Sequence, residues 1–196
     1  YVESWIGELE YADIPDVSKR LRVFLHNAGA MMNGRVYSVD VCPKAIHPTP
    51  LREVLEQGAV GERFFLRDDD MPQWKYAKGA KLEKRRRRDG SEYLFTEGSI
   101  RFPESLDMPS RTMLTSESQV GRTSHVVQDL TTGRLRVLTP EECERLNGFP
   151  DGWTNTGMPE RMRYFCMGNA LVVPLVTKIG EVLARAIIEL SEDTPC

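Results

Sequence analysis

The densest group of charged side chains is a run of cations between Trp74 and Arg88. Lysine recurs at every third position from Lys75 to Lys84, arginine fills positions 85–88, and Glu83 is the one acid within the run. Because the whole chain has a formal net charge of -3, these cations form a local feature that is typical of a phosphate-binding surface. A solvated loop is the alternative, since charge runs usually face water. The candidate phosphate contacts are Lys84, Arg85, Arg86, Arg87 and Arg88.

Two further arginines, Arg20 and Arg22, lie two positions apart in a segment whose alternation of polar and apolar residues predicts a half-buried strand over residues 20–25. Residues two apart on a strand point to the same face, so the two guanidinium groups would lie side by side. On spacing alone, the solvated face of an edge strand is the favoured interpretation.

Residues 138–153, LTPEECERLNGFPDGW, predict a short helix with defined ends. Thr139 is a good N-cap, Pro140 suits the first helical position, and Glu142 completes a capping box. Gly148 stands where a left-handed helix end is wanted, and Pro150 prevents continuation.

Residues 164–173, YFCMGNALVV, contain a Gly168-Asn169 pair that predicts a turn, followed by a long helix from Pro174. Apolar residues recur along that helix at helical spacing, as an amphipathic stripe does. Taken alone, a Gly-Asn turn is an ordinary structural feature and indicates no ligand.

In this order and spacing, the two segments resemble the last two sequence blocks of the DNA cytosine-5 methyltransferases. The resemblance is strong over residues 108–190 and weak over residues 10–26. There, Asp13, Pro15, Arg20 and Arg22 resemble the family's Gln-x-Arg-x-Arg block and its lead-in, although Ser18 stands where the family has Gln. Thr112, followed by Met113, resembles by position the Thr-aliphatic pair that closes the family's recognition domain.

The resemblance implies methyl transfer from S-adenosylmethionine to carbon 5 of a cytosine flipped out of double-stranded DNA. It implies that Arg22 hydrogen-bonds the flipped cytosine and that Arg20 braces the active site. The cofactor would be lined on one side by Gly168, Asn169, Ala170 and Leu171. DNA contacts would come from the basic run and Thr112, and one arginine of the last blocks would touch phosphate; the sequence does not choose among Arg134, Arg136 and Arg145.

Three features of the family are missing from the sequence: the Pro-Cys nucleophile, the Glu-Asn-Val block and the glycine-rich cofactor loop. Val41-Cys42-Pro43 has the nucleophile's order reversed. We therefore expect a portion that is inactive alone, whose partner is either a catalytic subunit or the N-terminal half of a longer enzyme.

The predicted fold class is mixed α/β, in which a small β-rich target-recognition domain is joined to elements that complete a Rossmann-like core. Residues 1–26 would end the core sheet, residues 27–112 would form the recognition domain, and residues 113–196 would return to the core. Strands are predicted at residues 35–41, 63–66, 92–95, 100–102, 111–115, 124–127 and 135–137, with a short helix at 51–57.

A hydrophobic fraction of 40% and a charged fraction of 28% indicate an ordinary soluble protein, and the chain shows no signal peptide and no membrane span. The four scattered cysteines predict reduced thiols and no zinc site. We expect a cytoplasmic protein of bacterial or phage origin, in a restriction-modification system. The alternatives are part of an RNA cytosine methyltransferase, a non-catalytic DNA-binding or regulatory module, and a purely structural interaction domain.

Overall fold

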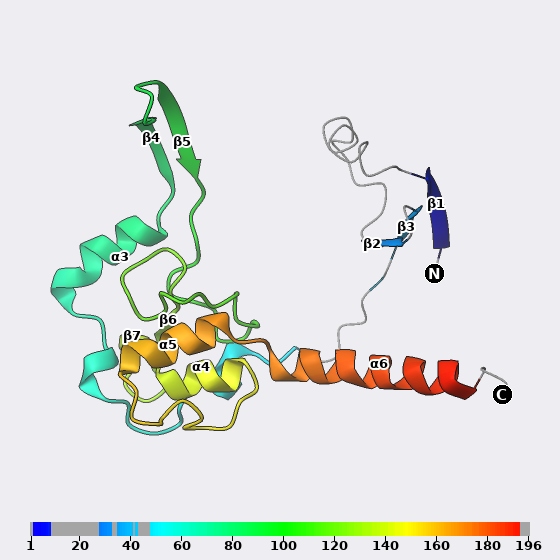
Figure 1. Ribbon diagram of the computed structural model, residues 1–196. Helices are drawn as coiled ribbons and strands as arrows, with labels where there is room; N and C mark the ends of the chain where they lie inside the picture. The colour runs from blue at the N-terminus through cyan, green and yellow to red at the C-terminus, as the bar shows by residue number, and fades with distance from the viewer. Residues whose placement is uncertain (1, 9–27, 33–34, 41, 43–47, 193–196) are drawn as a thin grey trace. The chain divides into compact units, whose positions relative to one another are not determined.

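The computed structural model describes residues 2–8, 28–32, 35–40, 42 and 48–192 (Figure 1). The chain divides into two compact units, residues 1–47 and 48–196. Arg20, Arg22 and the strand predicted around them lie outside the described residues.

The first unit contains a three-stranded antiparallel sheet in the order β1-β3-β2. Its strands are β1 (Val2–Glu8), β2 (Ala28–Met32) and β3 (Arg35–Asp40), and β3 pairs on both sides, with Ser38 opposite Ser4 and Gly29. The strand predicted at residues 35–41 is confirmed by β3.

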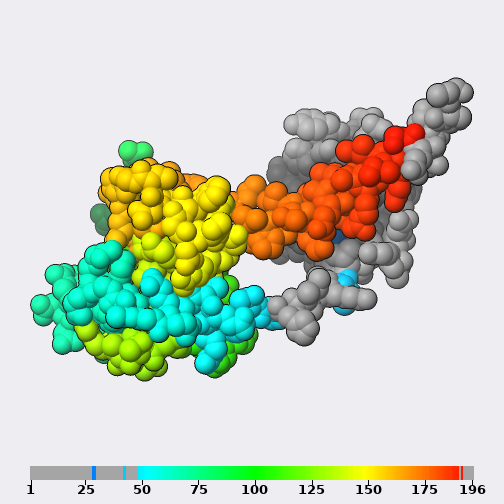
Figure 2. Space-filling model, turned by 90° about the horizontal axis from the view of Figure 1, so that it is seen from below, coloured from blue at the N-terminus to red at the C-terminus, as the bar shows by residue number. Residues whose placement is uncertain are grey.

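The second unit combines two short antiparallel ribbons, β4–β5 and β6–β7, with helices. In chain order its elements are α2 (Leu51–Val54), the 3₁₀ turns η2 (Glu62–Phe64) and η3 (Asp68–Asp70), α3 (Met71–Lys78), β4 (Lys81–Arg86), β5 (Glu92–Glu97), β6 (Val126–Gln128), β7 (Leu135–Val137), α4 (Pro140–Leu146), α5 (Glu160–Asn169) and α6 (Val173–Glu192). In the space-filling view, α4 and α5 and the segment from residue 51 to α3 form one continuous body (Figure 2).

The β6–β7 ribbon lies between two apolar clusters. Val127 of β6 joins one cluster with Leu138, Cys143 and Met167, whereas the adjacent Val126 joins another cluster. That second cluster contains Phe64, Trp74 and Val137. Because successive side chains of a strand point to opposite faces, a ribbon of only three residues per strand is buried on both sides.

Helix α4 confirms the predicted caps. The hydroxyl of Thr139 accepts the backbone N–H of Glu142 at 3.2 Å, and the Glu142 carboxylate accepts the N–H of Thr139 at 2.8 Å. Gly148 has a φ of +78°, and a Cβ placed there would lie 2.6 Å from Cδ of Pro174. A glycine is therefore required both for the helix end and for the approach of α6, whose Val173 N–H donates to the Asn147 carbonyl at 2.8 Å.

Four sequence predictions are wrong: three strands and one turn. Residues 63–66 form a 3₁₀ turn and one isolated bridge from Phe65 to Arg136, and neither residues 100–102 nor residues 111–115 form a strand. Gly168-Asn169 ends helix α5 and is not a turn, because Arg163, Tyr164 and Met167 face the interior at helical spacing. Residues 111–115 have no neighbouring strand; they are packed against the end of α5 instead.

Most of the basic run lies in regular structure, in α3 and β4, whereas Arg87 and Arg88 lie in the exposed turn that follows β4. The β4–β5 hairpin projects from the body of the second unit (Figure 1). Helix α6 extends away from α4 and α5 in the same view, and its described side chains are exposed along the whole helix. Among the described residues, no helix has the length and apolar character needed to cross a membrane.

Candidate functional site

Arg136, a candidate phosphate contact, is fully buried at the centre of an ion-pair network. Its Nη1 and Nη2 donate to the two carboxylate oxygens of Glu142 at 2.8 and 2.6 Å, and its Nε donates to Asp129 at 3.0 Å. Burial alone would lower the pKa of Arg136, but the hydrogen bonds to Glu142 and Asp129 hold it above its usual value. The structure thus assigns Arg136 to the frame of the domain and not to its cationic surface.

A second buried pair joins α4 to α5. Arg163 donates to Glu144 at 2.9 Å and to Glu141 at 2.8 Å, and its Nε donates to the Thr154 hydroxyl at 2.9 Å. Although burial raises the pKa of Glu144, hydrogen bonds from Thr154 and Arg163 bring it below its usual value. No sequence motif indicated this pair, since Arg163 lies in no recognisable motif.

The other two arginines of the last blocks lie at the surface, each paired with a carboxylate. Arg134 forms a two-pronged contact with Glu62 at 2.9 and 2.6 Å and lies 4.2 Å from the centre of the Phe65 ring. Arg145 holds Asp151 at 2.7 and 2.6 Å. The Arg134 side chain is 49% exposed and that of Arg145 is 29% exposed.

The candidate cofactor residues lie at the end of α5 and in the link to α6. A Cβ on Gly168 would lie 2.3 Å from the backbone nitrogen of Thr115, so this glycine lets α5 pack on residues 114 and 115. Asn169 is exposed and donates its amide to the Phe165 carbonyl at 3.0 Å. Leu171 is 72% exposed.

A cavity of about 340 Å³ brings part of the predicted site together. Gly168 and Ala170 form one wall, and Thr112 with its neighbours Ser110 to Met113 forms another. Candidate cofactor and DNA residues that are more than fifty positions apart in the sequence therefore meet at one opening. A larger cavity of about 800 Å³ contains only Arg134 of the candidates.

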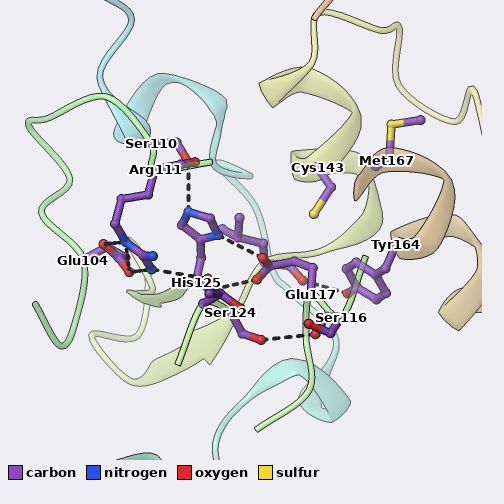
Figure 3. A network of polar contacts seen from close by, with 12 residues as sticks. Glu104, Ser110, Arg111, Ser116, Glu117, Ser124, His125, Cys143, Tyr164 and Met167 are labelled. Carbon is purple, nitrogen blue, oxygen red and sulfur yellow. Dashed lines mark hydrogen bonds and ion pairs between the residues drawn. The ribbon is translucent and has the colours of Figure 1, made fainter. Parts of the chain in front are cut away.

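A buried polar chain holds the Thr112 segment in place (Figure 3). Nε2 of His125 lies 3.0 Å from the Ser110 hydroxyl, and Nδ1 lies 3.0 Å from the Glu117 carboxylate. Arg111 is bound to Glu104 on the same segment. The order Ser-His-Glu is that of a hydrolase triad, but His125 and Glu117 are fully enclosed, and the Ser110 hydroxyl donates its one proton to the Arg111 carbonyl at 2.8 Å. This network of hydrogen bonds fixes the loop that contains Thr112, whose conformation the sequence patterns did not predict.

The basic hairpin, which is the β4–β5 hairpin, is hydrogen-bonded at its base to the rest of the second unit. Lys78, which is buried, donates to the carbonyl of Arg122 at 2.8 Å and to that of Ser124, and burial lowers its pKa to about 8. The Ile100 N–H donates to the Lys78 carbonyl at 2.8 Å, which closes the hairpin where β5 returns.

A family model described as C-5 cytosine-specific DNA methylase matches residues 12–185. The chain belongs to this family. It is 47% identical over 173 residues to the type II methyltransferase M.Sau3AI of Staphylococcus aureus, covering 88% of this chain and 41% of that protein. It is 35% identical over 86 residues to the type II methyltransferase M.MspI of Moraxella sp, covering 43% of this chain and 20% of that protein. The chain thus spans less than half the length of these relatives.

Two solved methyltransferase structures share the fold. The Dnmt2 methyltransferase of S. pombe gives a TM-score of 0.50 at 14% identity, covering 78% of this chain and 52% of that chain. The Entamoeba histolytica methyltransferase EhMeth gives a TM-score of 0.50 at 16% identity, covering 78% and 48%. The predicted class, mixed α/β elements of a Rossmann-like methyltransferase, is confirmed.

We expect Arg136→Met to lower the free energy of unfolding by roughly 3–5 kcal/mol, because it leaves two buried carboxylates without their cation. Arg134→Met is the matched control: it removes the same charge from an exposed pair and should cost at most about 1 kcal/mol. Urea unfolding of both variants measures the difference. Equal losses would contradict the structural role of Arg136.

Gly168→Ala should destabilise the chain by about 1–3 kcal/mol, because the new methyl group overlaps the Thr115 backbone. Gly180→Ala, also within a helix but in open space, should instead stabilise by up to about 1 kcal/mol through helix propensity. Thermal melts of the two variants should move in opposite directions. A stabilised Gly168→Ala protein would show that α5 does not pack closely here.

Proposed function

We propose that this chain is the target-recognition and cofactor-closing portion of a DNA (cytosine-5-)-methyltransferase, whose catalytic half is a second polypeptide or the remainder of a longer protein. The observation that carries the proposal is one of coverage: 88% of this chain matches only 41% of M.Sau3AI. The nucleophile and the glycine-rich cofactor loop would belong to the rest.

The exposed apolar surface of helix α6 supports the proposal that a neighbouring element covers it in the whole enzyme. Its apolar stripe is open to solvent, with Leu175 59%, Ile179 52% and Val182 57% exposed. An amphipathic helix normally buries such a stripe against another element, and a continuous apolar surface marks an interface. We propose that the catalytic half covers this stripe.

The cofactor of this reaction is S-adenosylmethionine, which would supply an electrophilic methyl group. Its amino-acid end would be held by Asn169, whose exposed side chain lies outside the cavity lining but between Gly168 and Ala170, which line it. Leu171 would add apolar contact from the link to α6. The opposite wall of the pocket would come from the catalytic half.

For DNA, we propose contacts from the basic hairpin, from Thr112 at the cavity, and from the surface arginines Arg134 and Arg145. Arg22 would hydrogen-bond the flipped cytosine, and Arg20 would brace the site. When a thiolate of the catalytic half adds to carbon 6, electron density moves onto the ring oxygen and nitrogen, and fixed cationic donors stabilise it.

The purified chain should transfer no methyl group to DNA, whereas addition of a polypeptide that carries the Pro-Cys block should restore transfer. Val182→Asp, on the apolar stripe of α6, should abolish this restoration without lowering the melting temperature, because the residue is exposed. Ala184→Asp, off the stripe, is the matched control and should leave it intact. Incorporation of labelled methyl groups is the measurement. Activity of the chain alone, or equal behaviour of the two variants, would contradict the proposal.

Asn169→Ala should weaken cofactor binding by the assembled enzyme about ten- to a hundredfold, since a hydrogen bond to a charged group contributes roughly 1.5–3 kcal/mol. DNA affinity should stay unchanged. Asn155→Ala, an exposed asparagine away from the cavity, is the control. Calorimetric titration beside a thermal melt distinguishes this role from a helix cap. A lowered melting temperature with unchanged cofactor affinity would mean that Asn169 only bonds to Phe165.

A further inference from the structure

The five cations from Lys84 to Arg88 look equivalent in the sequence, but the β4–β5 hairpin separates them. In its register Glu83 lies opposite Phe95, Lys84 opposite Leu94, and Arg85 opposite Tyr93. Because side chains alternate between the two faces of a strand, neighbouring cations point in opposite directions.

One face of the hairpin, called the paired face, holds its cations internally. The Arg85 guanidinium lies 3.5 Å from the centre of the Phe95 ring and 3.0 Å from the Glu83 carboxylate. Arg87 lies 4.8 Å from the centre of the Tyr93 ring. Glu83 also accepts the Tyr76 hydroxyl of α3 at 2.6 Å, so the paired face fastens the hairpin to the preceding helix.

The opposite face, called the open face, comprises the exposed residues of both strands: Leu82, Lys84, Arg86, Glu92, Leu94 and Thr96. Leu82 is 69% exposed and Leu94 58%, with no covering element among the described residues. No carboxylate of the described chain lies within ion-pair distance of Lys84, whereas Arg86 forms an ion pair with Glu92 at 3.7 Å, in which both side chains remain mostly exposed. The open face therefore combines solvent-exposed cations with two solvent-exposed leucines.

Ion pairs at its base hold the hairpin rigid, as an element that recognises a DNA sequence requires. Its first and last residues, Lys81 and Glu97, form an ion pair at 2.6 Å, and Glu97 also holds Arg122 of the body at 3.2 Å. From this base the two strands project clear of the helices of the unit (Figure 1).

We propose that the open face enters the major groove of duplex DNA and reads sequence there, with Leu82 and Leu94 against thymine methyl groups and Lys84 and Arg86 on the phosphates beside them. This inference rests on the proposed function. A major groove about 12 Å wide admits a two-stranded ribbon, and thymine alone presents a methyl group in it. The positive charge complements the phosphates, and Arg85 and Arg87 contribute by holding the ribbon straight.

Two double variants, each of which removes two positive charges, test which face of the hairpin contacts DNA. The measurement uses the full chain and a duplex of randomised sequence. Lys84→Ala/Arg86→Ala should flatten the slope of log affinity against log salt by about 1.8, as expected for two phosphates. Arg85→Gln/Arg87→Gln should leave that slope unchanged. Equal changes in both would overturn the choice of face while leaving DNA recognition intact.

A second measurement tests the leucines. Duplexes enriched from a random pool by the wild-type chain are resynthesised with uracil in place of thymine, which removes only the methyl groups. Each contacted methyl should be worth about fourfold in wild-type affinity, and Leu82→Ser/Leu94→Ser should abolish the difference between thymine and uracil. If uracil changes nothing for the wild type, the leucines do not read thymine. If the chain binds no duplex, alone or with a catalytic half, both this inference and the proposed function fail.

Discussion

The pairing of Arg136 with Glu142 fixes the geometry on which the candidate site depends. The same carboxylate accepts the N–H of Thr139, which caps α4, and the N–H of Glu56 at 2.8 Å, which follows α2. One side chain thus orients strand β7, helix α4 and the α2 segment. Burying such a pair costs desolvation of both ions, and only a fully hydrogen-bonded network offsets it.

These buried ion pairs determine where the cavity between Gly168 and Thr112 lies. Gly148 follows the C-cap of helix α4, and the start of α6 packs against it, while Arg163 with Glu144 fixes α5 beside α4. Gly168 at the end of α5 then lies directly on residues 114 and 115. The Thr112 segment and the end of α5, which hold the candidate DNA and cofactor residues, are therefore parts of one packed body.

The sequence predicted those elements whose signals are local. Thr139 and Glu142 specify α4 through a reciprocal cap, and the apolar period specifies α6. Prediction from the sequence failed where contacts between residues distant along the chain determine the local structure. Residues 111–115 have the composition of a strand but no strand beside them, and only the packing of α5 shows why Gly168 is a glycine. Arg134 and Arg136 look alike in the sequence; β7 begins at Leu135, so one arginine precedes the strand and stays at the surface while the other enters the core.

The distribution of ion pairs also explains why an acidic chain can carry a DNA-reading element. Most arginines of the second unit's body are held by carboxylates, as Arg111, Arg134, Arg145 and Arg163 are. Available positive charge is therefore concentrated on the hairpin, where the alternation of β4 leaves Lys84 and Arg86 outward. A recognition element with few free cations gains little affinity from phosphates alone. If the proposals above hold, tight binding would draw on base contacts from the open face and on the further surface of a catalytic half seated on α6.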